Sequence, residues 1–350
     1  MLTPRWWLAR IPEVFGDLAG KIAAGAELKV GEADYHRIEG GGKDFPVANE
    51  ARMFLRWQLP VHHAWPCNPE KTDRFIEKAA NAIADKFGAH TPQALCVGAF
   101  EPMAAQGYFR RLASNLRGRA LQLAPTANAD SESLAPDDPV VFAMVGRSGL
   151  FCGLQTPRQA NGFHPGGTRF IRQADNEVPS RAGAKIAEAL HHMRLLGGPP
   201  PAGARWLELG ASPGGMTAEL LRHGYRVTAI DRAPLHPSLD RAVGVDFFRA
   251  DVACWMPAAN QPHDALLCDM NGPADSSFAE VVRLAPSLRR GAPVVFTLKT
   301  AGAERFREIL DLHHRVLAAA AAAGLVHLQT THLTYNRREF TMFLSLRARS

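Results

Sequence analysis

The chain has 350 residues and a formal net charge of +6, and 46% of its residues are hydrophobic while 21% are charged. This balance is ordinary for a globular protein and excludes a chain too polar to form a core. A chain of this length can bury large cores, and two domains are expected. The mildly basic charge is compatible with a nucleic-acid partner without establishing one.

Several features place the chain in a reducing, aqueous compartment. The scattered cysteines have neither zinc-pair nor redox spacing, so we expect no metal site; they are Cys67, Cys96, Cys152, Cys254 and Cys268. Three histidine pairs are expected on the surface: His62–His63, His191–His192 and His313–His314. Residues 1–15 lack a continuous signal-peptide core, and the longest apolar stretch, 316–326, is too short to span a bilayer. We therefore expect a soluble, cytoplasmic protein without membrane contact.

The first half, residues 1–175, has weaker patterns and is expected to form a separate α+β region. Apolar residues at helical spacing predict a helix over 73–87. The segments 140–145 and 150–154 are predicted strands paired around a short turn. The segment 109–123 carries four arginines that can follow RNA phosphates or form a solvated helix face: Arg110, Arg111, Arg117 and Arg119.

The second half, residues 176–350, alternates strands and helices in the manner of a parallel sheet covered on both faces. Pro179 and Ser180 can cap a helix over 181–196. Five strands are then predicted, at 205–210, 226–231, 245–249, 264–269 and 292–299. Two last strands lie three residues apart and must pair antiparallel, at 326–335 and 339–347. The pattern predicts a Rossmann-like α/β fold, with a mostly parallel sheet and an antiparallel last strand.

A glycine-rich turn follows the first of these strands, in the sequence WLELGASPGGMT over 206–217. A strand that meets a helix N-terminus leaves backbone N–H groups free for a ligand, and glycine permits close approach. The glycine spacing is G-x-x-x-G-G, whereas dinucleotide sites have G-x-G-x-x-G, which argues against NAD and FAD. The turn residues expected at the ligand are Gly210, Ser212, Pro213, Gly214 and Gly215.

Two aspartates extend this candidate ligand site. Asp231 ends the next strand, roughly 20 residues past the turn, where an acid can hold ribose hydroxyls. A ribose-binding acid without a pyrophosphate turn indicates an adenosine ligand without phosphates, and S-adenosylmethionine is the obvious one. Asp251 follows the third strand and can meet the adenine amino group, or it is an ordinary turn aspartate. The alternative for the whole segment is a strand–turn–helix connection without a ligand.

Four ionisable residues are expected at one edge of the sheet. Asp269 ends the fourth strand, Lys299 ends the fifth, and Glu339 opens the antiparallel last strand. Open α/β sheets bind ligands at this edge. Lys185, one turn into the preceding helix, can reach over the crevice.

Such a cluster can activate a poor nucleophile. Methyl transfer from a sulfonium needs an aligned nucleophile, and a ribose hydroxyl must also lose its proton. Lys299 can take that proton if burial or a second cation, Lys185, lowers its proton affinity, while Asp269 and Glu339 orient the amines. Each residue also has a structural interpretation: a strand-end cap for Asp269, an edge lysine reaching solvent for Lys299, a solvated helix face for Lys185, and a hairpin ion pair with Arg337 or Arg338 for Glu339.

Together these motifs resemble the FtsJ-type ribose 2'-O-methyltransferases. The resemblance rests on the segments SRAGAKI (180–186), LGASPGG (209–215), CDM (268–270), LK (298–299) and RE (338–339). It implies a Rossmann-like methyltransferase fold over 176–350 and S-adenosylmethionine as methyl donor. It also implies that Lys299 is the catalytic base, with Lys185, Asp269 and Glu339 assisting. The implied cofactor contacts are Ser180, Gly210, Ser212, Pro213, Gly214, Gly215, Asp231, Asp251 and Asp269.

Within that class, the long N-terminal half and the sequence 179–181 followed by Lys185 are most similar to the bacterial large-subunit rRNA methyltransferase M family. This resemblance implies a THUMP-like RNA-binding region over 1–175. It further implies that the substrate is a cytidine ribose in the peptidyl-transferase loop of 23S rRNA, methylated before the ribosome is fully assembled. Met216 and Glu208 depart from the aromatic residue and the aspartate usual in the family.

Three alternatives stay open from the sequence alone. The chain can be a 2'-O-methyltransferase of another RNA, a methyltransferase for a small molecule or protein, or a non-catalytic RNA-binding assembly factor. A basic strip leading to the crevice favours an RNA substrate over a small molecule or protein. A wide separation of Lys185 and Lys299 favours the assembly factor.

Overall fold

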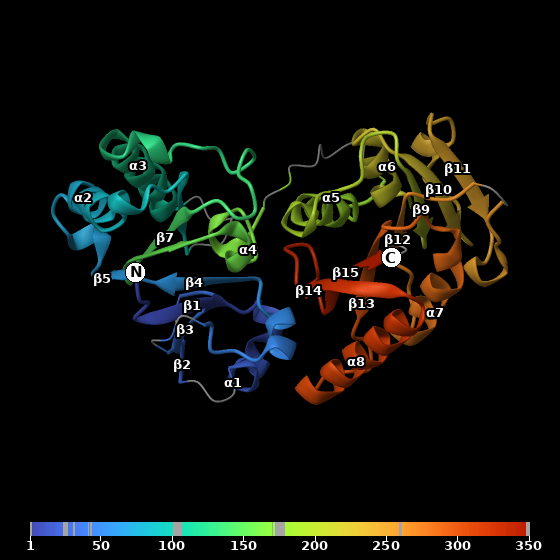
Figure 1. Ribbon diagram of the computed structural model, residues 1–350, viewed down its shortest axis with the longest axis horizontal. Helices are drawn as coiled ribbons and strands as arrows, with labels where there is room; N and C mark the ends of the chain where they lie inside the picture. The colour runs from blue at the N-terminus through green and yellow to red at the C-terminus, as the bar shows by residue number, and fades with distance from the viewer. Residues whose placement is uncertain are drawn as a thin grey trace. The chain divides into compact units, whose positions relative to one another are not determined.

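The computed structural model describes residues 2–23, 27–30, 32–40, 42, 44–100, 107–169, 171, 179–258 and 261–347. The chain divides into two units, Met1–Phe170 and Ile171–Ser350 (Figure 1). The domain boundary predicted between residues 175 and 176 lies outside the described residues. Within those described ranges, no helix combines the length and apolar character needed to cross a membrane.

The first unit contains two four-stranded sheets. The first sheet is antiparallel with order β2-β3-β1-β4, and its strands are β1 (Trp6–Arg10), β2 (Leu28–Val30), β3 (Tyr35–Glu39) and β4 (Trp57–Val61). The second has order β5-β8-β7-β6 with β6 parallel to β7, and its strands are β5 (His63–Pro66), β6 (Ala94–Ala99), β7 (Val140–Gly146) and β8 (Gly149–Gln155). The α-helices of this unit are α1 (Ala19–Ile22), α2 (Phe75–Phe87), α3 (Tyr108–Leu123) and α4 (Pro157–Ala160).

Most of the elements predicted in this half are confirmed. The helix predicted over 73–87 is α2, and the arginine-bearing segment 109–123 is α3. Both helices bury their apolar faces against β6, β7 and β8. The two predicted strands are β7 and β8, which pair antiparallel with Gly146 opposite Gly149.

The first sheet was not predicted from the sequence. Four consecutive residues of β1 and four of the five residues of β4 are buried. A strand covered on both faces lacks the alternation of apolar and polar residues by which a half-exposed strand is recognised.

The second unit is built on a seven-stranded sheet with order β11-β10-β9-β12-β13-β15-β14. The strands are β9 (Arg205–Leu209), β10 (Arg226–Asp231), β11 (Val245–Arg249), β12 (Ala265–Cys268), β13 (Pro293–Lys299), β14 (Leu325–Thr331) and β15 (Glu339–Leu346). Only β15 runs antiparallel to its neighbours, and the other described pairs are parallel. The predicted mostly parallel sheet with an antiparallel last strand is therefore confirmed.

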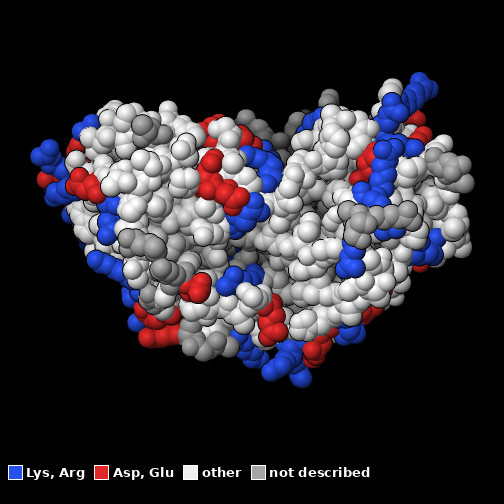
Figure 2. Space-filling view, viewed as in Figure 1, with Lys and Arg blue, Asp and Glu red and all other residues white. Residues whose placement is uncertain are grey.

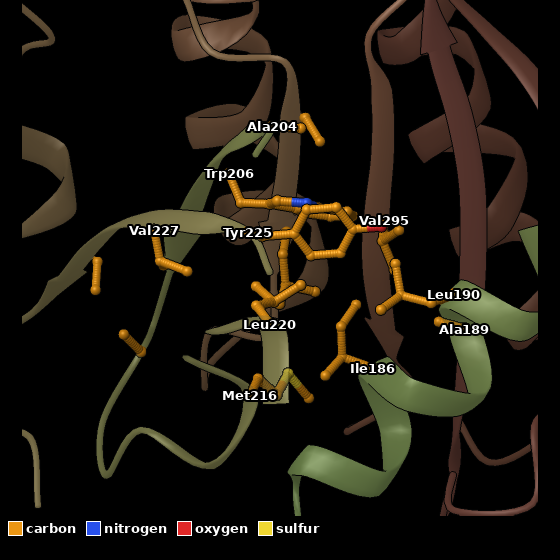
Figure 3. Packing of buried hydrophobic residues seen from close by; sticks show 14 of the residues in the cluster. Ile186, Ala189, Leu190, Ala204, Trp206, Met216, Leu220, Tyr225, Val227 and Val295 are labelled. Atoms are coloured by element: carbon orange, nitrogen blue, oxygen red, sulfur yellow. The ribbon is translucent and has the colours of Figure 1, made fainter. Parts of the chain in front are cut away.

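Helices cover both faces of this sheet, as Figure 1 shows. They are α5 (Gly183–His192), α6 (Gly215–Arg222), α7 (Ala274–Leu284) and α8 (Phe306–Ala322). Neighbouring residues of β13 point to opposite faces. Val295 belongs to the core shared with Ile186 of α5 and Leu220 of α6 (Figure 3), whereas the ring of Phe296 lies 5.0 Å from that of Phe278 in α7.

The strand order reverses direction beside β9, at the carboxyl edge of the sheet. The chain continues from the central strand β9 outward to β10 and β11, and then returns to β12 on the other side of β9. Loops leaving β9 and β12 therefore diverge, which is the usual ligand position in open α/β sheets. The residues that follow these two strands are Gly210 and Asp269.

Three details of the second half differ from prediction. The predicted strand 326–335 ends at Thr331, because the backbone N–H groups of Thr334 and Tyr335 donate to the Glu188 carboxylate, at 2.9 and 3.3 Å, and not to a neighbouring strand. Helix α5 begins at Gly183 and not at residue 181. Ser180 does not cap it, because its Oγ accepts from the N–H of Ala182 in the turn that precedes the helix.

The expectation that the histidine pairs lie on the surface is wrong for four of the six residues. The buried ones are His62, His191, His192 and His313. His192 shows the reason: its ring stacks on Phe343 and shares a hydrogen bond with Gln329, so its polar edge has a partner inside the fold.

Candidate active site

The four predicted ionisable residues meet at the carboxyl edge of the sheet. Asp269 directly follows β12, Lys299 is the last residue of β13, and Glu339 is the first residue of β15, in register with Lys299. Lys185 lies in the first turn of α5, and the burial of Ile186 next to it fixes this turn against the sheet.

The Asp269 carboxylate lies between the two amines. Lys299 Nζ is 3.3 Å from its Oδ1, and Lys185 Nζ is 3.5 Å from its Oδ2. Lys185 also forms a close ion pair with Glu339. The four side chains are only 11–21% exposed. Two cations and two anions thus balance in a partly desolvated cluster, where charged groups act more strongly on one another than they do in water.

The amine of Lys299 has two further acceptors. Its Nζ donates to the backbone carbonyl of Asp269 at 3.1 Å and to Oδ1 of Asn271 at 2.8 Å. Asn271 was not predicted as a site residue, and only its position two residues after Asp269 could have drawn attention to it. This loop therefore holds Lys299 through two uncharged oxygens in addition to one carboxylate.

Both lysines of the second unit are in this cluster. Lys185 and Lys299 are the only lysines in the sequence from residue 171 to 350, although arginines occur throughout it. Arginine stays protonated in proteins, whereas a lysine amine can lose its proton and act as a base. Lysine thus occurs in this unit where a cation that can be deprotonated would be useful.

The glycine turn is shaped by contacts within the protein. Gly210 and Gly214 have φ angles of +80° and +103°, in the left-handed region that favours glycine. A Cβ on Gly210 would lie 2.9 Å from the Cα of Met270, and one on Gly215 would collide with Ser180. Gly210 and Gly215 are therefore needed because other loops of the protein pack closely against this turn. The space that a Cβ would occupy is filled by protein atoms and is not left open for a ligand.

Asp231 fastens this turn to β10. Its Oδ2 accepts from the N–H of Ser212 at 2.9 Å, and its Oδ1 accepts from the N–H of Ala233 at 2.8 Å. The Oγ of Ser212 donates to the carbonyl of Pro234 at 2.9 Å. A carboxylate has about four acceptor positions, so Asp231 keeps free acceptors for the two hydroxyls of a ribose.

Asp251 is engaged as a turn aspartate. Its Oδ1 accepts from the N–H of Ala253 at 3.1 Å at the start of the 3-10 helix Val252–Cys254. The Arg232 guanidinium pairs closely with its other oxygen and holds the pKa of the Asp251 carboxyl below its usual range. These contacts are those of the structural alternative, and a contact of Asp251 with adenine stays a prediction.

The donor set suits a cationic adenosine ligand better than a dinucleotide. Asp231, Asp269 and Glu339 place carboxylates at the ends of three strands of one edge. Carboxylates repel a pyrophosphate and attract a sulfonium or an amine. The residues present therefore fit S-adenosylmethionine.

Glu208 is a buried acid beneath the turn. It is 2% exposed, and the Thr217 hydroxyl donates to its Oε2 at 2.7 Å. Burial, with smaller contributions from the nearby carboxylates of Asp269 and Asp231, raises the pKa of the Glu208 carboxyl to about 8, although the hydrogen bond from Thr217 opposes the change. Glu208 is therefore largely protonated at neutral pH.

A Glu208→Gln variant should be stabilised relative to the wild type as the pH rises. The folded protein holds this proton up to about pH 8 while the unfolded chain loses it near pH 4.5, so the wild-type unfolding free energy falls across that window. Glutamine imitates the protonated acid and does not titrate. The unfolding free energy of the variant should therefore rise relative to that of the wild type by roughly 3–5 kcal/mol from pH 4.5 to 8. Urea unfolding of both proteins at several pH values measures this difference.

The matched control is Glu219→Gln, because Glu219 is also buried but pairs with Arg222 and His223. This variant should not gain stability as the pH rises. Parallel pH curves for the wild type and Glu208→Gln would contradict the assigned protonation state.

The arginine-bearing face of α3, for which the sequence left RNA binding and a solvated surface equally open, is only partly free. Arg117 donates from Nε to the carbonyl of Leu95 at 2.9 Å, and Arg119 pairs with Glu77 at 2.9 Å. Figure 2 shows basic and acidic side chains interspersed on the face in view. The positive net charge therefore does not by itself locate an RNA-binding surface.

Residues 178–317 match the family model described as FtsJ-like methyltransferase. The chain is 30% identical over 305 residues to the ribosomal RNA large subunit methyltransferase M of Thauera aminoaromatica, with 85% of this chain and 79% of that protein covered. It is 31% identical over 271 residues to the protein of the same name from Halorhodospira halophila, with 75% and 74% covered. Among solved structures, TrmN from Thermus thermophilus covers 97% of this chain and 99% of its own at 14% identity. Its TM-score of 0.37 is too low to support a conclusion.

Proposed function

The chain belongs to the bacterial ribosomal RNA large subunit methyltransferase M family, and from this premise we propose that it transfers a methyl group from S-adenosylmethionine to a ribose 2'-hydroxyl of 23S rRNA. The observation that carries the proposal is the Asp269 carboxylate held between the amines of Lys299 and Lys185 at 3.3 and 3.5 Å. This arrangement provides a base for a hydroxyl nucleophile next to a site that suits adenosine.

Each group of site residues has a proposed role. The residues proposed to bind the methyl donor are Ser180, Gly210, Ser212, Pro213, Gly214, Gly215, Asp231, Asp251 and Asp269. When bound, S-adenosylmethionine supplies an electrophilic methyl group on its sulfonium. Lys299 Nζ accepts the proton of the 2'-hydroxyl, and Asp269 holds both amines in place. Lys185, paired with Glu339, is the second cation of the cluster and holds the other carboxylate oxygen of Asp269.

The proposed target is a cytidine in the peptidyl-transferase loop, methylated before the ribosome is fully assembled. Unpaired, unstacked nucleotides are the usual targets of sequence-specific RNA recognition, and the 2'-hydroxyl distinguishes RNA from DNA. We assign RNA binding to the first unit as a THUMP-like region, supported by its α+β composition.

Exposed arginines next to the cluster support an RNA substrate. Arg337 and Arg338 directly precede Glu339 and are exposed, as are Arg305 and Arg307 at the start of α8. The two loops are joined because the backbone N–H and Oγ1 of Thr300 donate to the carbonyl of Arg338, at 3.3 and 2.7 Å. Phosphates on either side of the target ribose would find cations here.

Replacing Arg337 and Arg338 together by alanine should weaken RNA binding by about tenfold at physiological salt and reduce the slope of log K against log salt by roughly 1–2. S-adenosylmethionine affinity should not change. Filter binding at several salt concentrations measures the slope.

The matched control is the double variant Arg226→Ala with Arg347→Ala, because both arginines are exposed and lie at the opposite edge of the sheet. If the two double variants lost RNA affinity equally, Arg337 and Arg338 would no longer support an RNA substrate.

The proposed substrate is tested by adding the protein and radiolabelled S-adenosylmethionine to three preparations lacking the modification: naked 23S rRNA, assembly intermediates and complete large subunits. Label should enter rRNA, and complete subunits should be the poorest substrate. Label in protein or small molecules but not in RNA would overturn the proposal.

A further inference from the structure

We propose that Asn271 is the positioning residue for the base, holding Lys299 through an uncharged acceptor and leaving one position of the amine for the substrate proton. This inference rests on the proposed function, because it assigns a task to Lys299. It adds a residue that lies outside the Lys–Asp–Lys–Glu cluster.

The hydrogen bonds of Lys299 leave one position of its amine without an aligned acceptor. Its two aligned bonds go to the Asp269 carbonyl and to Asn271 Oδ1. The approach to Asp269 Oδ1 at 3.3 Å is an ion pair without hydrogen-bond alignment, since that oxygen has no hydrogen bond within the described part of the chain. An ammonium has three N–H donors, whereas a neutral amine has two and one lone pair. Two aligned acceptors thus fix the amine and leave its third position for the substrate proton.

The charge around Lys299 explains why an amide suits this position. Asp269 and Lys185 come from the β12–α7 loop and α5, and Glu339 faces Lys299 in register from β15, so the charges of the cluster balance. The Cys268 thiol adds no charge, because burial raises its pKa to about 12. A carboxylate in place of Asn271 would leave the cluster with an excess negative charge and favour the protonated amine.

The test compares Asn271→Asp and Asn271→Ala with the wild type. Asn271 is exposed, so neither change disturbs the core. Gln261→Glu, at an exposed position before β12 at the opposite edge of the sheet, is the control for the added charge. The first readout is the dependence of kcat on pH. The second is the NMR titration of lysine ε-carbons labelled with 13C, in which the Lys299 signal is assigned by its loss in Lys299→Arg. The third is S-adenosylmethionine affinity by calorimetry.

In Asn271→Asp, the acid limb of the kcat profile and the Lys299 titration should both move up by about 1–3 pH units. The kcat plateau at high pH should be retained, because an oxygen acceptor is still present. In Asn271→Ala the plateau should fall by about 10- to 100-fold, since the amine is less well placed, and the acid limb should not move up. Donor affinity should be unchanged in both variants and in the control.

The inference would be overturned if both Asn271 variants had the same kcat–pH profile and the same Lys299 titration as the wild type. It would also be overturned if weaker binding of S-adenosylmethionine explained the whole loss of activity. The NMR arm separates this inference from the proposed function. If the wild type methylates no ribose, the proposed function fails. In that case, a Lys299 signal that titrates at higher pH in Asn271→Asp than in the wild type still supports the contact between Asn271 and Lys299. A signal that titrates at the same pH in both proteins overturns that contact.

Discussion

Replacing Lys299 with alanine should lower kcat for RNA methylation by about 10²–10⁴-fold, the usual contribution of a general base. The loss follows from geometry, because Lys299 Nζ is the amine held by Asp269 and Asn271 at the carboxyl edge of the sheet. S-adenosylmethionine affinity should be unchanged, since Lys299 is not itself among the proposed donor contacts. Single-turnover rates and calorimetry on the same preparations separate the two effects.

Two further variants sharpen this result. Lys299→Arg keeps the positive charge but cannot supply a neutral amine, so it should be as inactive as the alanine variant. Arg226→Ala removes an exposed cation at the opposite edge of the sheet and should retain full activity. Substantial activity in Lys299→Arg would show that positive charge is enough and that Lys299 is not the base.

Replacing Asp269 with asparagine should lower kcat by roughly 100-fold or more, because both amines lose the carboxylate that fixes them. The same change should move the acid limb of the pH profile down, since protonated Lys299 loses a counter-charge. A lower plateau together with an acid limb at lower pH distinguishes loss of positioning from loss of the base. The dependence of kcat on pH measures both.

Asp275→Asn is the matched control. Asp275 lies at the start of α7 and pairs with Arg315 at 2.9 Å, with both side chains more than half exposed. Its replacement should change neither limb nor plateau. An acid limb that moves up in Asp269→Asn would contradict the arrangement of charges described above.

The sequence was sufficient to predict that the four ionisable residues meet, because that prediction depended on sheet topology. Asp269, Lys299 and Glu339 each stand at a strand end, and the alternation of strands and helices determines which ends share an edge. The reversed last strand was needed to bring Glu339 to this edge, and it was indicated by the short connection before it. Lys185 was expected at the same edge because it lies near the start of the helix that precedes β9.

Other features required the three-dimensional structure. No periodicity marks Asn271, whose part depends on the path of a loop after β12. The reason for Gly210 and Gly215 also lies in other loops, since Met270 and Ser180 occupy the space that a Cβ would need. The arginines of α3 form a basic run in the sequence, yet Arg117 and Arg119 have partners within the fold.

The measurement that tests the account most directly is the chemical identity of the methylated nucleoside. Unmodified 23S rRNA is treated with the wild type or with Lys299→Ala, digested to nucleosides and analysed by mass spectrometry. The account predicts 2'-O-methylcytidine after wild-type treatment and its near absence after treatment with the variant. A methyl group on a base atom, or equal 2'-O-methylcytidine from both proteins, would contradict it.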